Sequence, residues 1–257
     1  MATPSEYKPV SILITGASSG IGAALALAFA ADGVRLALGG RDRERLREVV
    51  TACRAVGATA DGTVIDVTDR QRMRDWLYDA NRAAALDLVV ANAGISGGTA
   101  GDGESEDQVR RIFDANLTGV LNTVHPTIES MRRRGRGQIA IMSSAASFRG
   151  FPGAPAYSAS KAAVRAYGEA LRGTLHRDGI AVSVICPGFV RSRMTEANPF
   201  HMPMLMDADR AARIIKRGLA RNRARIGFPW PVYFSAWLAG ALPPALTDPL
   251  FRRLPEK

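Results

Sequence analysis

The sequence predicts an α/β protein in which a doubly wound, parallel β-sheet forms a single domain, residues 1–257. Short apolar runs alternate with longer helical patterns along most of the chain. Such runs are typical of strands that a parallel sheet buries on both faces, with crossover helices between them. A glycine-rich turn follows the first run, and no linker rich in Pro, Gly or Ser divides the chain into two parts.

The expected elements repeat one βα unit. Short, apolar and uninterrupted runs predict strands at residues 10–14, 34–38, 60–65, 86–91, 138–142 and 180–186. Longer patterns that carry more charge predict helices at residues 21–31, 42–56, 69–84, 106–133 and 155–177. Residues 97–106 are rich in glycine and are expected to form a loop. Right-handed crossovers bring the carboxyl ends of the strands to one edge of the sheet, where ligands bind.

The composition is that of an ordinary globular protein. Forty-seven per cent of the residues are hydrophobic and 23% are charged, which excludes a disordered chain, a collagen-like fibre and a polytopic membrane protein. The two cysteines, Cys53 and Cys186, are too few for a disulfide scaffold and favour a reducing compartment. Residues 1–10 contain no signal-peptide pattern, so a cytoplasmic location is expected.

The net charge of +10 raises nucleic acid or an anionic membrane as partners. Of the 34 basic residues 30 are arginines, which indicates a compositional bias. The chain has no zinc-finger spacing and no basic block interleaved with aromatic residues, so nucleic acid is not an expected partner. His125, His176 and His201 are scattered, and the cysteines lack partner spacing; no metal site is expected.

The turn after the first predicted strand has the form of a phosphate-binding site. Glycines allow a sharp turn and a close approach of the backbone to a pyrophosphate, and the following helix N-terminus offers unpaired N–H groups. The alternative is a glycine-rich turn with no ligand. The placement between strand and helix favours dinucleotide binding by Gly16, Ser18, Ser19, Gly20, Ile21 and Gly22.

The end of the second predicted strand indicates which dinucleotide binds. NAD-selective sites place Asp or Glu there, but this strand runs into Gly39, Gly40 and Arg41. An arginine suits a 2′-phosphate, which an acid would repel. NADP(H) is therefore favoured over NAD(H), with Arg41 and Ser18 on the phosphate; the alternative is that Arg41 is simply solvated.

Tyr157 and Lys161 are four residues apart and lie on one face of the predicted helix. A free phenol has a pKa near 10, and a nearby cation would lower it toward the working range of a general acid or base. Ser144 follows a predicted strand at the ligand-binding edge, where its hydroxyl can donate to a substrate oxygen. Tyr and Lys at this spacing are more often surface neighbours, so the pair gains meaning only beside a nucleotide site.

The motifs together resemble the short-chain dehydrogenase/reductase family, in its compact single-domain, Rossmann-type branch. The resemblance covers about residues 9–195, and Ser144 precedes Tyr157 by 13 positions, the usual interval in that family. Ala91 replaces a common Asn, and Ser192 stands where Thr is frequent. The matching segments are TGASSGIG (15–22), Asp66-Val67, ANAG (91–94), Asn116, Ser143-Ser144, YSASK (157–161) and PGFVRS (187–192).

The resemblance implies a role for each catalytic position. Tyr157 would exchange a proton with the substrate oxygen, and Lys161 would lower the Tyr157 pKa and bind the nicotinamide ribose. Ser144 would polarise the substrate oxygen. Asn116 would hold a water that relays protons to Lys161; the alternative is an amide that satisfies a helix kink.

The resemblance also implies cofactor contacts outside the glycine-rich turn. Asp66 would meet the adenine amino group. The adenosine side would further involve Val67, Asn92, Ala93 and Gly94, and the nicotinamide side Pro187, Gly188, Val190 and Ser192.

The expected function is an NADP(H)-dependent oxidoreductase that transfers hydride between the nicotinamide and a carbonyl or secondary alcohol. A catalytically silent NADP-binding regulator or sensor is the alternative. The four catalytic residues argue against it, because binding alone does not need an acid/base pair. Epimerisation or dehydration, as in extended relatives, would need a larger substrate domain. Family members commonly form dimers or tetramers, so a homodimer or homotetramer is expected.

Two segments near the end of the chain bear on the substrate and on contacts with a membrane or another subunit. Residues 194–206 hold Met194, Met202, Met204 and Met206 and predict an adaptable lid over a partly apolar substrate, or a filled gap in the core. Many relatives end in a strand, but here a basic helical pattern at 209–225 is expected to precede an apolar C-terminal extension, residues 226–257. An unbroken helix is expected only at 232–242, too short to span a bilayer. The extension could contact an anionic membrane, form a subunit contact, or cover the pocket.

Overall fold

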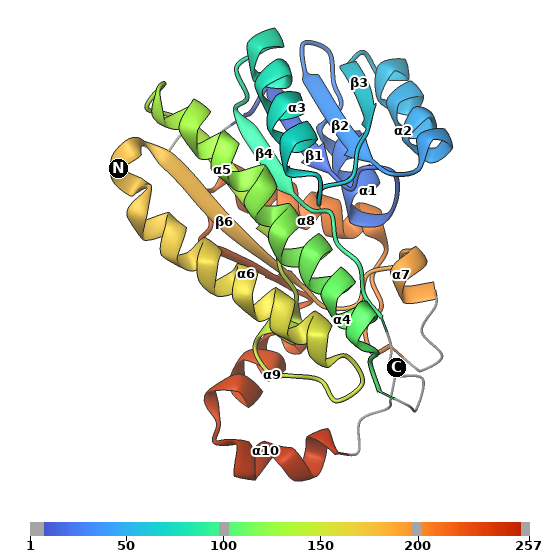
Figure 1. The fold of residues 1–257 in the computed structure, drawn as a ribbon, viewed down its shortest axis with the longest axis vertical. Coiled ribbons are helices and arrows are strands. Elements are labelled where there is room, and N and C mark those ends of the chain that lie inside the picture. Colours follow the sequence, from blue (N-terminus) through green and yellow to red (C-terminus); the bar gives the residue numbers. More distant parts are fainter. Residues whose placement is uncertain (1–7, 98–102, 197–201, 253–257) are drawn as a thin grey trace.

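The computed structural model describes residues 8–97, 103–196 and 202–252, and within them seven strands form one parallel sheet in the order β3-β2-β1-β4-β5-β6-β7 (Figure 1). The order reverses between β1 and β4, which opens a crevice at the carboxyl ends of these strands. The predicted doubly wound α/β fold is confirmed. The strands are β1 (Ser11–Thr15), β2 (Arg35–Gly40), β3 (Thr59–Val64), β4 (Leu88–Ala91), β5 (Gly137–Met142), β6 (Ile180–Pro187) and β7 (Arg225–Phe228).

Helices cover both faces of the sheet. On one face α1 (Gly20–Phe29), α2 (Arg43–Ala55) and α8 (Ala208–Ala220) pack against Ile12 and Ile14 of β1. On the other face α3 (Arg70–Ala83), α5 (Gly119–Arg132) and α6 (Pro155–Thr174) pack against Leu13. Successive side chains of a strand point to opposite faces, so one short apolar run supplies both cores. All three of these β1 side chains are fully buried.

The long helical pattern at 106–133 forms three consecutive pieces. α4 (Glu106–Phe113) and α5 are joined by a π-helical turn, Asp114–Thr118. Ser105 caps α4 by accepting a hydrogen bond from the Gln108 N–H at 3.3 Å. A π-helical turn inserts one extra residue into a helix and redirects the side chains within it. Here the turn carries Asn116.

The strand β7 differs from the sequence-based prediction. A helix was expected through Arg225, but α8 ends at Ala220 and Arg225–Phe228 pairs in parallel with β6, Val184 facing Arg225. The expectation that this chain lacks the final strand found in many relatives is therefore wrong. Four residues that include an Arg and a Gly give almost no strand pattern, and pairing with β6 stabilises the segment instead.

The apolar C-terminal extension forms α9 (Trp230–Ala241) and α10 (Pro244–Phe251), which lie together at one end of the molecule (Figure 1). Pro243 separates them: α9 agrees with the helix expected at 232–242, whereas the second helix, α10, was not expected and begins at Pro244, where proline is tolerated in the first turn. α10 packs through Phe251, whose ring lies 5.6 Å from that of Phe151. Among the helices that the structure describes, none combines the length and apolar character needed to cross a membrane.

Candidate active site

Three glycines of the turn after β1 are required by close contacts. A Cβ at Gly16 would lie 2.8 Å from the Ala93 Cα, and one at Gly22 would lie 2.2 Å from the Gly16 carbonyl oxygen. Gly20 has φ +55° and faces Ser192, whose Cβ would lie 3.0 Å from an added Cβ. Only glycine tolerates these approaches and the left-handed conformation. The turn therefore leaves an open backbone cradle at the N-terminus of α1.

Thr15 and Asn92 hold this cradle in place. The Thr15 hydroxyl accepts hydrogen bonds from the backbone N–H groups of Asn92 and Ala93, at 3.0 and 3.1 Å. The Asn92 carboxamide donates to the carbonyls of Thr15 and Gly16, at 2.9 and 3.2 Å. Asn92 thus locks the turn to the end of β4. This role of Thr15 was not predicted, although its place at the end of a buried strand marks it as a polar group that needs partners.

Ser18 lies against Gly40, the last residue of β2, which directly precedes Arg41. A Cβ at Gly40 would lie 3.0 Å from the Ser18 Cβ, so Ser18 and Arg41 border the same corner of the crevice. Arg41 is 66% exposed at its side chain and lies 4.0 Å from Asp66. Asp66 in turn accepts hydrogen bonds from the Thr68 N–H and hydroxyl, both at 2.9 Å. The corner thus combines an exposed guanidinium with a carboxylate that already accepts two hydrogen bonds.

The segment after β4 connects the cradle to the predicted catalytic pair. Ala93 touches Gly16, and the next residue, Gly94, lies against Lys161: an added Cβ would be 3.2 Å from the Lys161 Nζ and 2.8 Å from the Asn116 Oδ1. Val67, the residue after Asp66, is buried and packs against Gly119 of α5. The segment after β4 therefore joins the glycine turn to α6, the helix that carries Tyr157 and Lys161.

Tyr157 and Lys161 lie on α6, one turn apart. The Lys161 Nζ is 5.8 Å from the centre of the Tyr157 ring and donates to the Met142 carbonyl at 2.9 Å. Only 3% of Lys161 is exposed, and this burial lowers the pKa of its ammonium to about 8. Burial raises the pKa of the Tyr157 phenol, and a hydrogen bond with Ser144 lowers it in part. The expected lowering of the Tyr157 pKa is therefore wrong for this state, because desolvation dominates.

Ser143 and Ser144 have different surroundings. Ser143 is buried and its hydroxyl donates to the Lys161 carbonyl at 2.8 Å. Ser144 begins a 3₁₀ turn, Ala145–Ser147, and its hydroxyl accepts a hydrogen bond from the Ala146 N–H at 3.1 Å. Its hydrogen bond with Tyr157 makes Ser144 the serine that faces the phenol.

Asn116 is fully buried in the π-helical turn. Its Oδ1 accepts from the Ile95 N–H at 2.8 Å, and its Nδ2 donates to the Ile95 carbonyl at 2.9 Å and to the Ser160 hydroxyl at 3.0 Å. These bonds satisfy the amide with partners outside its own helix, and they fix the segment after β4 to α6. The Asn116 Oδ1 and the Lys161 Nζ both lie close to Gly94.

The segment after β6 closes the other side of the crevice. Pro187 ends β6, and the Gly188 N–H donates to the Phe228 carbonyl at 2.7 Å. Val190 pairs with Met206, and the Ser192 N–H donates to the Thr195 hydroxyl at 2.8 Å. Met206 is buried in the core, whereas Met204 is 52% exposed. Residues 197–201 of the predicted lid, with Pro199 and Phe200, lie outside the described residues.

A glycine cradle at a helix N-terminus, placed where the strand order of a parallel sheet reverses, defines a dinucleotide-binding α/β protein. A Cβ at Gly16 or Gly22 would meet the turn's own backbone or the segment after β4, so only glycines allow the tight turn that presents helix N-terminal N–H groups to a pyrophosphate. The residues present fit a nicotinamide dinucleotide.

Comparisons with known proteins agree with this class. Residues 11–201 match the family model described as short chain dehydrogenase. An uncharacterized oxidoreductase of Myxococcus xanthus is 41% identical over 97% of this chain and 99% of its own length. A granaticin polyketide synthase putative ketoacyl reductase of Streptomyces violaceoruber is 40% identical over 76% of this chain and 73% of its own length.

Two solved structures have the same fold and carry different dinucleotides. A short chain dehydrogenase from Mycobacterium paratuberculosis bound to NAD has a TM-score of 0.75 at 28% identity, with 84% of this chain and 93% of that chain covered. A short-chain dehydrogenase from Sphingobium yanoikuyae in complex with NADPH has a TM-score of 0.76 at 26% identity, with 95% and 96% covered. The chain belongs to the short-chain dehydrogenase/reductase family and is an oxidoreductase.

Proposed function

We propose that this oxidoreductase uses NADP(H) to interconvert a carbonyl compound and a secondary alcohol, with Ser144, Tyr157 and Lys161 as catalytic residues. One observation carries the proposal: the segment after β4 touches the glycine cradle at Gly16 and the Lys161 ammonium at Gly94, so a dinucleotide in the cradle can extend to the phenol. The relatives and neighbours named above, a putative ketoacyl reductase and structures with NAD or NADPH, support a carbonyl substrate and a nicotinamide cofactor.

The proposed chemistry assigns one task to each side chain. A bound nicotinamide supplies or accepts the hydride. In the reducing direction Tyr157 gives its proton to the carbonyl oxygen, and the Ser144 hydroxyl donates a hydrogen bond to the same oxygen. The raised pKa of Tyr157 keeps the phenol protonated at neutral pH, as a general acid requires. The Lys161 cation stabilises the phenolate that forms, and a water beside Asn116 would return a proton to this pair.

The pH dependence of carbonyl reduction follows from Lys161. Its pKa of about 8 means that the stabilising cation is present below pH 8 and is lost above it, while Tyr157 stays protonated through this range. We therefore expect kcat to fall as the pH rises through about 8, measured as NADPH oxidation between pH 6.5 and 9.5. Lys161→Arg, which keeps the cation at high pH, should move this limb upward. A wild-type rate that stays constant to pH 9.5 would contradict the assignment.

The preference for NADP(H) is assigned to Arg41 and Ser18. We expect Arg41→Ala to weaken NADPH binding about tenfold, the size of one charge-assisted hydrogen bond, and to leave NADH binding unchanged. Arg47→Ala is the control, because Arg47 is an exposed α2 arginine paired with Glu44. Both dissociation constants can be measured by titration calorimetry. Equal losses for the two dinucleotides, or no loss for NADPH, would refute the role of Arg41.

The experiment that tests the proposed function is NADPH oxidation with a panel of ketones, aldehydes and ketoacyl thioesters of increasing apolar size. Turnover of any member supports the proposal, and the preferred size reports on the lid at 194–206. The competing candidate, a silent NADP-binding regulator, predicts tight NADPH binding with no turnover across the panel.

We propose a homodimer or homotetramer in the cytoplasm, since members of this family commonly assemble through long helices such as α5 and α6. The exposed side chains of Trp230, Phe234 and Trp237 on α9 are available for a subunit or membrane contact. Analytical ultracentrifugation, with and without anionic vesicles, distinguishes these alternatives.

A further inference from the structure

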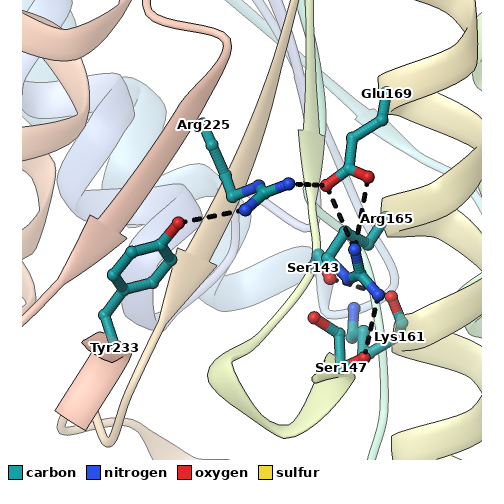
Figure 2. A network of polar contacts seen from close by, with 7 residues as sticks. All are labelled: Ser143, Ser147, Lys161, Arg165, Glu169, Arg225 and Tyr233. Atoms are coloured by element: carbon teal, nitrogen blue, oxygen red, sulfur yellow. Dashed lines mark hydrogen bonds and ion pairs between the residues drawn. The ribbon is translucent and has the colours of Figure 1, made fainter. Parts of the chain in front are cut away.

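A cluster of charged side chains contacts the loop after β5 at Ser147, three residues after Ser144 (Figure 2). Glu169 of α6 is its centre. The Arg165 Nη1 donates to both Glu169 oxygens at 3.2 Å, and the Arg225 Nη2 of β7 lies 2.7 Å from the Glu169 Oε1. The Arg225 Nη1 also donates to the Tyr233 hydroxyl of α9 at 3.3 Å. These four residues, called here the Glu169 cluster, link α6, β7 and α9.

The two arginines hold the end of the Ser144 loop. The Arg165 Nη2 donates to the Ser147 carbonyl at 3.4 Å. The guanidinium carbons of Arg165 and Arg225 lie 4.6 and 5.4 Å from the centre of the Phe148 ring. Ser147 ends the 3₁₀ turn that Ser144 begins, and Phe148 is the next residue. The loop is therefore fixed to α6 three residues beyond its catalytic hydroxyl.

Helix α9 packs against the same loop. The Tyr233 ring contacts Phe148 edge-on, with ring centres 5.5 Å apart. A Cβ at Gly240 would lie 2.2 Å from the Phe148 carbonyl oxygen, and a Cβ at Gly227 would lie 2.0 Å from the Tyr233 ring. Such close backbone approaches leave the loop little freedom to move away from α6.

One rigid helix carries both the reacting groups and the anchor. Tyr157, Lys161, Arg165 and Glu169 follow at intervals of four residues along α6. Since Ser144 must meet the same substrate oxygen as Tyr157, the distance between the loop and α6 decides whether the two groups act together. An error of about 1 Å in such a placement can reduce the rate about 100-fold.

We propose that Glu169, through Arg165 and Arg225, is a positioning residue that holds the Ser144 loop against α6 and so aligns the Ser144 hydroxyl with Tyr157. The inference rests on the proposed function for the role of Ser144. The proposal also gives the C-terminal extension a role near the active site, because Tyr233 of α9 packs against Phe148 of the Ser144 loop.

The side chains of Arg165, Glu169 and Arg225 are only 22–33% exposed. Loss of the carboxylate would leave two partly buried guanidiniums close together without a counter-charge, which destabilises the loop. A merely structural role would lower the stability of the whole protein, and activity would then follow stability. A positioning role would lower activity even where the stability of the protein is restored.

Glu169→Gln, which keeps the side-chain shape, tests the proposal. We expect kcat for carbonyl reduction to fall about 10- to 100-fold and NADPH affinity to stay within about twofold. Hydrogen exchange of the 144–150 amides in the dinucleotide-free protein should accelerate. Asp178→Asn is the matched control, because it breaks the Arg132–Asp178 ion pair, whose Nη2–Oδ2 distance is 2.8 Å, far from the loop. This control should leave kcat and loop exchange unchanged.

A double variant separates position from stability. Glu169→Gln with Arg225→Gln removes one of the two unpaired guanidiniums and so their mutual repulsion, so the melting temperature should partly recover while kcat and loop exchange do not. Recovery of kcat together with the melting temperature, or unchanged loop exchange in Glu169→Gln, would overturn the inference. If the wild type turns over no carbonyl compound, the proposed function fails, and loop exchange still tests whether Glu169 holds the loop.

Discussion

Replacing Tyr157 with phenylalanine is expected to reduce turnover by about 1,000-fold or more, because the variant keeps the ring and loses the phenolic O–H, the only group of this side chain that can give or take a proton. The phenol shares a hydrogen bond with Ser144, and the Lys161 Nζ lies 5.8 Å from the centre of its ring, so the hydroxyl removed is the one next to both groups. NADPH affinity should change by no more than about twofold, since the cradle at Gly16 is untouched. Stopped-flow NADPH oxidation and fluorescence titration measure the two quantities.

Tyr167→Phe is the matched control for this prediction. Tyr167 lies on the same helix, and its hydroxyl is 3.3 Å from the His125 Nε2, away from the crevice. Its loss should leave turnover within about twofold of wild type. Substantial activity in Tyr157→Phe, or an equal loss in Tyr167→Phe, would remove Tyr157 from the mechanism.

Replacing Gly22 with alanine is expected to weaken NADPH binding about 10- to 100-fold and to destabilise the fold by about 1–3 kcal/mol, as overpacking of a tight site does. The added Cβ would meet the Gly16 carbonyl oxygen at 2.2 Å and the Asn92 Nδ2 at 2.6 Å. Both contacts belong to the lock that holds the cradle, so the turn must open to make room. Titration calorimetry and thermal unfolding check the two effects.

Gly173→Ala is the control for this prediction, and we expect it to stabilise the protein instead of destabilising it. Gly173 lies in α6 with no atom within 4 Å of an added Cβ. Alanine there should stabilise the protein by about 0.5–1 kcal/mol and leave NADPH binding unchanged. Gly22→Ala with wild-type affinity would mean that the cradle does not bind the dinucleotide.

The sheet could be predicted from the sequence because its strands depend on local pattern. β1, β4, β5 and β6 are short, buried, mostly apolar runs, and burial on both faces requires such runs, whereas the edge strand β3 (TADGTV) is largely exposed. β7 could not be predicted in this way, because four residues beginning with Arg225 carry no periodicity and depend on pairing with β6. The π-helical turn at Asn116 was hidden for a similar reason: its bonds to Ile95 and Ser160 join residues 21 and 44 positions away.

The candidate site was predictable where motif and topology agree. Tyr157, Lys161 and Ser144 meet because α6 and the loop after β5 share one edge of the sheet. The locking role of Asn92 and the Glu169 cluster could not be foreseen, since each depends on contacts between segments far apart in the chain. The environment also reverses one expectation: desolvation, which the sequence does not reveal, raises the Tyr157 pKa.

The most direct test of the account is a structure of this protein with NADP⁺ bound. The account predicts the pyrophosphate on the Gly16–Gly22 cradle, the 2′-phosphate between Ser18 and Arg41, and the nicotinamide ribose about 3 Å from the Lys161 Nζ, within hydrogen-bond distance. A dinucleotide bound elsewhere, or one whose nicotinamide end points away from Tyr157, would contradict it.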